Sequence, residues 1–390
     1  MSLFRAVRTP LSTSSLLCQG LRSVTGFGAG DAADHKVVPV EEARRFAEEC
    51  LKSVGAKETH ASQMAELLVS ADSRGHYSHG MNRLEMYVRD IQQGSTRVDA
   101  EPELERSTSS TALVNGNQCL GATVGQFSMD LAIQKAKESG VGWVAAHGSN
   151  HYGIAGWYAL RACDQGLMGL SFTNTSPLQV PTRGRECVLG TNPIALAAPG
   201  NNGDSFVLDM ATSTTAIGKV ELCKRKDSKI PNGWGVAENG QETNDPNQVL
   251  GKGGLMPLGG TEVSGGYKGY GLAMMVEVFC GILSGSHYGT GIRKWIGQHD
   301  VPANLGQCFI AVDPNCFAPG FADRMQALMS YCRDMEPAEG AENVMVAGDP
   351  ERHHLKEVER LGGVSYHDNL VSAMAKLSAE LSVPAMQPKA

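Results

Sequence analysis

Two short segments of the chain place a histidine beside groups that could handle a proton and an anion. In the first segment, residues 75–80, Ser78 and His79 are adjacent, and Arg83 follows shortly after. An imidazole is an effective general acid or base near neutral pH, and a guanidinium can hold a carboxylate through two parallel hydrogen bonds. The same pattern also fits a surface loop in which Ser78 caps a helix.

The second segment, residues 147–153, contains His147 and His151 and directly follows a predicted strand. Loops at strand ends are where α/β proteins place ligand chemistry, so His151 is a second candidate for proton transfer. His147 and His151 have the i,i+4 spacing of metal ligands. However, Gly148 argues against a shared helical face, and no nearby acidic residue or cysteine completes a ligand set. We therefore expect no metal, and keep a metal-dependent hydrolase or lyase as an alternative.

Small polar residues also gather where other predicted strands end, at 173–177, 190–193 and 209–213, and a glycine-rich segment at 265–271 carries Lys268. Such loops can offer N–H groups to a phosphate or a ribose, and Asp209 could orient a histidine or bind a ribose hydroxyl. Taken singly, each patch is better explained by ordinary turns. Neither G-x-G-x-x-G after a strand nor a Walker loop occurs, so motif rules alone predict no dinucleotide site.

The elements that must position these residues alternate between helix and strand. Apolar periodicity predicts helices at 39–69 (two helices), 83–92, 125–138, 153–165, 270–284, 322–335 and 370–381. Strands are predicted at 111–114, 141–146, 167–173, 194–198, 206–208 and 308–312. The polar stretch 224–260 is expected to be an excursion on the surface or at an interface. This βαβ-like rhythm predicts a mixed α/β fold.

Composition excludes several classes of protein. The chain has 390 residues, 42% of them hydrophobic, and a net charge of −7 without a dense basic stripe, so nucleic acid is not expected as a partner. No apolar run approaches the ~20 residues of a membrane helix. Ten cysteines without a C-x-x-C pair indicate free thiols in a reducing compartment.

The first thirty residues differ from the rest of the chain. They contain Arg5, Arg8 and Arg22, many serines and threonines, and no acidic residue. This composition predicts a mitochondrial transit peptide cleaved near residues 22–23. A disordered tail on a cytoplasmic protein is the alternative. The remaining chain is divided into an N-terminal helical portion (31–110), an α/β domain (111–350) and a C-terminal helical portion packing back on the N-terminal one (351–390).

Read together, five of these segments resemble one family, the malate/L-lactate dehydrogenases that lack a Rossmann fold. That family also includes sulfolactate and ureidoglycolate dehydrogenases and Δ1-piperideine-2-carboxylate reductases. The resemblance spans residues 40–383, and its motifs occur in the family's order: Ser78-His79-Gly80 with Arg83, Asn150-His151-Tyr152-Gly153, Gly190-Thr191-Asn192-Pro193, Leu208-Asp209-Met210-Ala211-Thr212-Ser213 and Lys268-Gly269-Tyr270-Gly271-Leu272.

The resemblance implies an NAD(P)-binding α/β fold with a mixed sheet and helical ends, assembled as a homodimer. It implies hydride transfer between NAD or NADP and a small 2-hydroxy or 2-oxo acid of the malate, lactate or sulfolactate type. Reduction of cyclic 2-imino acids is the alternative. Cofactor contacts are implied at Thr175, Asp209, Met210, Ala211, Lys268, Gly269, Gly348, Asp349 and Pro350.

Catalytic roles also follow from the resemblance. Ser78, His79 and Asp209 match a proton relay with His79 as donor, His151 matches a proton acceptor that also contacts substrate, and Arg83 matches the carboxylate-binding arginine. The chain departs from the family at two places. Residues 347–349 read Ala-Gly-Asp where members often have Pro-Gly-Glu, and Ala303 stands where the ureidoglycolate type has an arginine.

Overall fold

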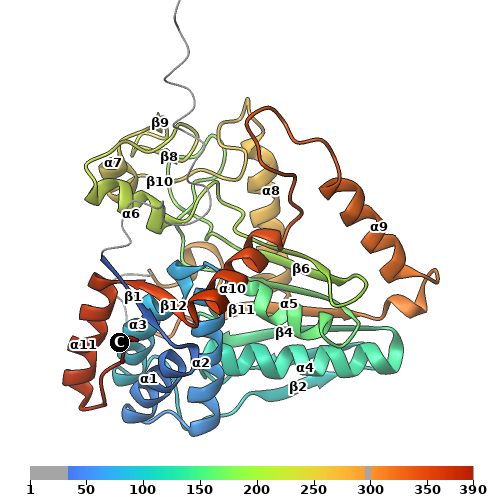
Figure 1. Cartoon of the computed structure of the whole chain (residues 1–390), viewed down its shortest axis with the longest axis horizontal. Helices are drawn as coiled ribbons and strands as arrows, with labels where there is room; N and C mark the ends of the chain where they lie inside the picture. The colour runs from blue at the N-terminus through green and yellow to red at the C-terminus, as the bar shows by residue number, and fades with distance from the viewer. Residues whose placement is uncertain (1–33, 295–299, 390) are drawn as a thin grey trace, which may run out of the picture.

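A seven-stranded mixed sheet forms the centre of the computed structural model, which describes residues 34–294 and 300–389 (Figure 1). The predicted transit peptide lies outside the described residues. The strand order is β2-β3-β4-β11-β5-β6-β7. The strands are β2 (Glu103–Ser107), β3 (Thr111–Asn115), β4 (Val141–Ser149), β5 (Met168–Thr173), β6 (Ile194–Pro199), β7 (Ser205–Met210) and β11 (Leu305–Val312). The predicted mixed α/β fold is confirmed.

The predicted βαβ rhythm is present, but one late strand interrupts it. Helix α4 (Gly121–Ser139) joins the parallel neighbours β3 and β4, and α5 (Ala155–Cys163) joins β4 to β5. β11, from much later in the chain, lies between β4 and β5 and pairs antiparallel with both. It is buried along nearly its whole length, because it is central and covered on both faces.

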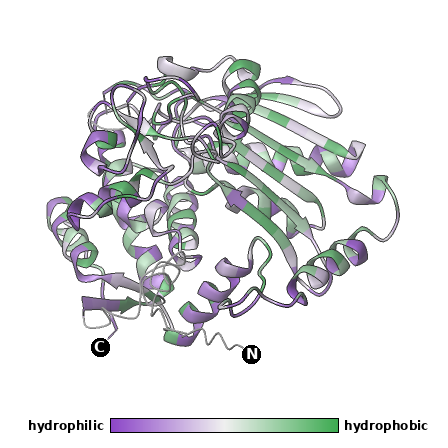
Figure 2. Cartoon of the chain, turned by 90° about the horizontal axis from the view of Figure 1, so that it is seen from above, coloured by the Kyte–Doolittle hydropathy of each residue, from purple (hydrophilic) through white to green (hydrophobic). Residues whose placement is uncertain are grey.

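Both faces of this sheet are covered by helices. Phe309 and Ala311 of β11 belong to the main core with α4 and α5, whereas Cys308 and Ile310 pack on the opposite face. That second face is covered by α8 (Gly266–Glu277) and the π-helical turn Val278–Ile282 that continues it. Figure 2 shows hydrophobic residues concentrated along the sheet strands.

The N- and C-terminal portions lie side by side (Figure 1). They contain β1 (His35–Val38), α1 (Val40–Ser53), α2 (Glu58–Ser73), α3 (Leu84–Gln92), α10 (Asp349–Leu361), β12 (Val364–His367) and α11 (Asp368–Leu381). β1 pairs antiparallel with β12 and so ties the two portions together. The sequence reading missed β1, β2, β12 and α10, which are short or strongly polar.

The polar stretch 224–260 is more ordered than a plain surface excursion. It contains α7 (Pro246–Leu250) and a small sheet of β8 (Gly235–Val236), β9 (Glu242–Thr243) and β10 (Gly254–Leu255), and follows α6 (Ile217–Arg225). Ile230, Val249 and Leu255 of this stretch form a small core together with Val220 of α6. Helix α9 (Phe321–Arg333) lies beside β6 and β7, near one edge of the sheet (Figure 1). No helix in the described part of the chain is long and apolar enough to cross a membrane.

Candidate active site

The segment between α2 and α3 consists of two 3-10 turns, Tyr77–His79 and Met81–Arg83. It is fixed by Asp72 near the end of α2, whose fully buried carboxylate accepts hydrogen bonds from Met81 N–H and the Tyr366 hydroxyl, both at 2.8 Å. A side chain at Gly80 would overlap that carboxylate. Gly80 is therefore required by the close approach of Asp72 to the loop that carries His79.

Ser78, His79 and Arg83 hold one another in place within this loop. Ser78 Oγ lies 2.8 Å from His79 Nδ1, and Arg83 Nε donates to the Ser78 carbonyl at 2.7 Å. Ser78 thus binds its neighbouring imidazole instead of capping a helix. Burial, with the Arg83 charge nearby, lowers the pKa of His79 to about 3. The imidazole is consequently neutral at physiological pH.

His151 enters the same site from the segment between β4 and α5. Its ring stacks on that of His79, with centroids 5.8 Å apart and planes 15° from parallel. His151 Nδ1 lies 2.6 Å from the Tyr87 hydroxyl and accepts the Gly153 N–H at 3.3 Å. Because Nδ1 is an acceptor, the neutral ring carries its proton on Nε2. Burial and the neighbouring His79 and Arg83 lower the pKa of His151 well below its usual range.

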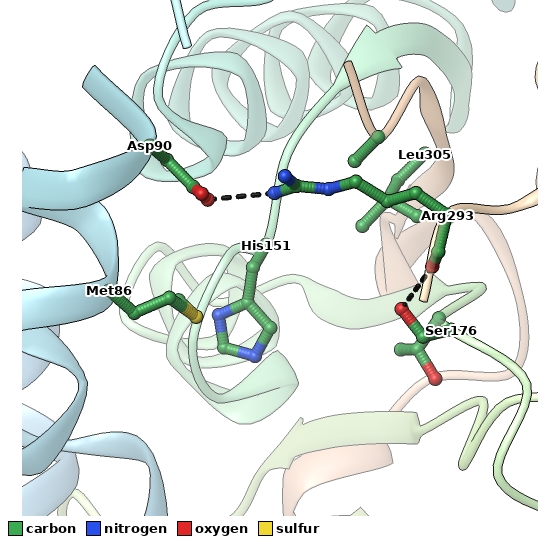
Figure 3. A pocket seen from close by; sticks show the side chains of 8 residues that line it. Met86, Asp90, His151, Ser176, Arg293 and Leu305 are labelled. Carbon is green, nitrogen blue, oxygen red and sulfur yellow. Dashed lines mark hydrogen bonds and ion pairs between the residues drawn. The ribbon is translucent and has the colours of Figure 1, made fainter. Parts of the chain in front are cut away.

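A small pocket adjoins His151 (Figure 3). It is lined by Met86, Asp90, His151, Thr175, Ser176, Arg293, Ala303 and Leu305. The pocket brings a predicted catalytic residue, His151, next to a predicted cofactor contact, Thr175. It also contains an ion pair in which Arg293 Nη2 donates to Asp90 Oδ2 at 2.8 Å.

Sequence reasoning missed Tyr87, Asp90 and Arg293. Tyr87 and Asp90 follow Arg83 at spacings that place all three on one face of α3. That spacing is a signal that could have identified Tyr87 and Asp90 from the sequence. Arg293 belongs to no motif, because only the path of the chain before β11 brings it to this pocket.

Asp209 is the second-to-last residue of β7. The sequence analysis instead placed it in a loop after a shorter strand. Its Oδ2 accepts the N–H of Gly156 in α5 at 2.7 Å. Burial raises the pKa of Asp209, and the nearby charge of His76 opposes that rise. Among the described residues its carboxylate makes no hydrogen bond to His79. The Ser78–His79 contact is thus present, and the extension of the relay to Asp209 stays a prediction.

Several predicted cofactor contacts are joined through short backbone links. Thr175 Oγ1 accepts the Thr191 N–H at 2.9 Å. Met210 and Ala211 lead into Thr212, whose carbonyl accepts the Leu258 N–H at 2.8 Å. Gly269 packs so closely on the Leu258 backbone that a side chain there would overlap it, and the adjacent Lys268 is exposed. The segments at 209–211 and 268–269 therefore lie side by side.

Gly348, Asp349 and Pro350 form the beginning of α10. Gly348 has a φ of 99° and precedes the helix, and Pro350 lies in its first turn. The Asp349 carboxylate accepts hydrogen bonds from Arg333 at 2.8 Å and Arg352 at 2.6 Å. These two guanidiniums lower the pKa of Asp349 to about 2, although burial opposes them. Its oxygens thus have partners within the protein, and a cofactor contact at 348–350 stays a prediction.

His147 does not join His151 in this site. It lies within β4, which extends three residues beyond the predicted strand, and its Nε2 is 3.0 Å from Glu105 Oε2 on β2. Across residues 34–294 and 300–389, no group of three or more histidines, cysteines and acidic residues is arranged to hold a metal. The arrangement around His79 and His151 is suited instead to binding an anion at Arg83 and moving a proton beside it.

Comparison with known proteins gives consistent matches over most of the chain. The sequence profile described as malate/L-lactate dehydrogenase matches residues 38–375. The chain is 37% identical to malate dehydrogenase of Pyrococcus abyssi over 354 residues, covering 90% of this chain and 96% of that protein. It is 35% identical to L-sulfolactate dehydrogenase of Methanocaldococcus jannaschii, covering 89% and 98%.

Solved structures agree with the sequence matches. Malate dehydrogenase from Pyrococcus horikoshii OT3 superposes with a TM-score of 0.84 at 35% identity, covering 92% of this chain and 99% of that one. Δ1-piperideine-2-carboxylate reductase from Pseudomonas syringae superposes with a TM-score of 0.78 at 27% identity. Further sequence relatives are named ureidoglycolate dehydrogenase (NAD(+)) in Escherichia coli and (2R)-3-sulfolactate dehydrogenase (NADP(+)) in Chromohalobacter salexigens.

Proposed function

The chain is an oxidoreductase that belongs to the malate/L-lactate dehydrogenase family, and from that premise we propose that it transfers a hydride between NAD(P) and a small 2-hydroxy acid. The observation that carries the proposal is the meeting of Arg83, His79 and His151 at one site, beside a pocket that also contains Thr175.

Arg83 is the group that would bind the substrate's carboxylate. Its backbone begins α3, and its Nε–H contact with the Ser78 carbonyl fixes the guanidinium beside His79. Burial lowers the pKa of Arg83, while the neighbouring Tyr87 and Glu221 oppose that shift, so the site already compensates part of the cost of burying a cation. A carboxylate bound there would hold C2 of the acid next to the two imidazoles.

The two neutral imidazoles would then have different roles at the C2 oxygen: one donates a hydrogen bond, and the other accepts the hydroxyl proton. Tyr87 and Gly153 contact Nδ1 of His151, so in this tautomer Nε2 donates to the C2 oxygen. This differs from the proton-acceptor role that the family resemblance implies for His151. If the Nδ1–H of His79 donates to Ser78 Oγ, the Nε2 lone pair of His79 is available to take the hydroxyl proton. The bound nicotinamide supplies the chemistry of accepting the hydride from C2. Loss of both hydrogens leaves a 2-oxo acid, and the reverse steps reduce it.

The N-terminal ends of α6 and α8 have the electrostatic character that suits the phosphates of a dinucleotide. Neither α6 nor α8 has a side-chain cap or an acidic residue in its first turn, so the partial positive charge of each N-terminus is uncompensated by its own residues. At Gly218, in the first turn of α6, an added Cβ would meet nothing within 4 Å. By contrast, α10 begins with Asp349 and Glu351. We infer that the anionic cofactor lies nearer α6 and α8.

A homodimer is proposed on the strength of an exposed apolar face. Tyr267, Met274, Val278 and Ile282, spaced along α8 and its continuation, are each 43–55% exposed. Contiguous apolar surface on a helix face is the usual mark of an interface. Since the family resemblance implies a homodimer, we infer that a second copy covers this face. Mitochondrial location is proposed from residues 1–30, and a fluorescent protein fused behind those residues would test it.

A second candidate is reduction of a cyclic 2-imino acid at the same site. It is favoured by the structural likeness to Δ1-piperideine-2-carboxylate reductase. Such a substrate has the same carboxylate for Arg83 and a C2 centre that accepts hydride. Measuring NADH and NADPH consumption with 2-oxo acids and with cyclic 2-imino acids separates the two candidates.

The proposed function is tested by cofactor reduction with malate, lactate and 3-sulfolactate, each with NAD and with NADP. At least one 2-hydroxy acid should be oxidised. Arg83→Ala and Arg83→Lys should lower kcat/KM roughly 30- to 900-fold, which corresponds to about 2–4 kcal/mol of transition-state stabilisation. Alanine removes the contact with the carboxylate, and the point charge of lysine cannot replace its bidentate geometry. Arg89→Ala is the control, since Arg89 lies on the same helix and pairs with Glu85 and Glu380 at the surface. Unchanged kcat/KM in the Arg83 variants would contradict the proposal.

A further inference from the structure

The pocket beside His151 contains a charged pair whose position the reaction above does not explain. Arg293 Nη2 meets Asp90 Oδ2 at 2.8 Å, and the two side chains are only 12% and 5% exposed. Figure 3 shows Arg293 reaching across the pocket, from the side of Leu305 and Ser176, to Asp90 on α3. The pair therefore spans the pocket between the N-terminal helical portion and the segment that precedes β11.

Stability alone is a weak reason for such a pair. Desolvating a carboxylate and a guanidinium costs several kcal/mol per ion, and a buried ion pair often stabilises a fold no more than apolar residues of similar size would. The remaining walls near Arg293 are largely apolar, with Met86, Ala303 and Leu305. A guanidinium has five N–H donors, so it can hold a protein carboxylate and an acid group of a ligand together.

The position of the pair relative to the reacting centre gives it a chemical meaning. Arg83 begins α3 and Asp90 lies seven residues later on the same face, which separates them by about 10 Å along the helix axis. Tyr87 lies between them and hydrogen-bonds His151. An acid held by Arg83, with C2 at His151, would thus direct the group on its next carbon toward Arg293. Acid groups at the two ends of a short 2-hydroxy acid are therefore the chemistry that Arg83 at one end of this helix face and Arg293 at the other would hold.

We propose that Arg293, oriented by Asp90, is the specificity-determining residue, and that it binds a second acid group, a carboxylate or sulfonate, carried by the carbon next to the carbinol. This inference rests on the proposed function and narrows its substrates to 2-hydroxy acids with two anionic ends. Lactate would bind through Arg83 alone. Malate and 3-sulfolactate would bind through both arginines.

The test compares wild type with Arg293→Gln, which keeps a polar side chain and removes the charge. Each is assayed with malate, with the malate analogue whose distal carboxylate is an amide, and with lactate. Wild type should prefer malate to both others. Arg293→Gln should lower kcat/KM for malate roughly 10- to 150-fold, the range of one lost charge-assisted contact, and leave lactate nearly unchanged. Arg293→Lys keeps the positive charge but lacks the planar guanidinium. Its kcat/KM for malate should lie between those of Arg293→Gln and wild type.

Three outcomes would overturn the inference. The distal amide could serve as well as malate, Arg293→Gln could lower malate and lactate equally, or wild type could oxidise lactate as well as it does malate. An equal decrease for malate and lactate would mean that the ion pair maintains the shape of the pocket and does not bind the second acid group. If Arg293→Gln fails to fold, the Arg293→Lys comparison of the three substrates decides the same question. Failure of wild type with every 2-hydroxy acid would instead contradict the proposed function itself.

Discussion

Replacing Tyr87 by phenylalanine tests the arrangement around His151 most directly. Tyr87 is 2% exposed, and its hydroxyl lies 2.6 Å from His151 Nδ1. The substitution removes one oxygen and keeps the ring that packs in the core. His151 Nδ1 would lose the shorter of its two described contacts and retain the one with Gly153 N–H at 3.3 Å, so the tautomer with the proton on Nε2 would be less strongly enforced.

The size of the effect follows from the contact that is lost. A buried acceptor left without its partner costs about 1–3 kcal/mol. Because the Gly153 N–H still partly satisfies Nδ1, we expect the lower part of that range, about 1–2 kcal/mol. That corresponds to a decrease in kcat/KM of roughly 5- to 30-fold. The measurement is kcat/KM for the 2-hydroxy acid and for the 2-oxo acid, with the free energy of unfolding from urea titration.

Tyr152→Phe is the matched control. Tyr152 is also buried, and its hydroxyl lies 3.0 Å from Ser171 Oγ inside the sheet. Within the described part of the chain, that hydroxyl forms no hydrogen bond with an imidazole. This variant should lose a similar free energy of unfolding, about 1 kcal/mol, while kcat/KM stays close to that of wild type. The reasoning is refuted if Tyr87→Phe has the wild-type kcat/KM, or if both variants lose activity to the same extent.

The remaining predictions concern pH, the catalytic loop and assembly. Burial holds the pKa of His79 (about 3) and of His151 below the 6.5 of an unfolded chain, so below pH 6.5 the unfolded chain binds more protons. The free energy of unfolding should therefore fall on acidification, by about 1.4 kcal/mol per histidine at pH 5.5, and His79→Asn should reduce this slope in urea titrations. Gly80→Ala should lower kcat more than tenfold and should lower the free energy of unfolding by about 1–3 kcal/mol, because the added Cβ overlaps the buried Asp72 carboxylate. A wild-type kcat in this variant would show that the loop can move away from Asp72. Val278→Glu should convert a dimer to a monomer in light scattering, and a dimer that persists at low micromolar concentration would place the interface elsewhere.

Much of the local structure could be predicted, because it depends on residues near one another in sequence. Gly140, with a φ of 86°, caps α4 after Ser139, within two residues of the helix end predicted at residue 138. The apolar runs of β3, β5 and β6 and the periodicity of α11 were recognised within a residue or two. Strand ends were less certain: β4 continues through His147 because it pairs with Asn115 of β3, and β7 continues through Asp209 because it pairs with Ala195 of β6.

The sequence by itself determined a mixed α/β chain, the segments able to bind an anion and move a proton, and the family to which they belong. Residue types and spacing suffice for these features, since a helix end or a short motif is encoded locally. Only the tertiary structure decided that β11 separates β4 from β5, that Tyr87 and Gly153 contact Nδ1 of His151, and that Arg293 meets Asp90 across the pocket. These contacts join residues up to about two hundred positions apart, and only burial of a shared core brings such distant side chains to one place.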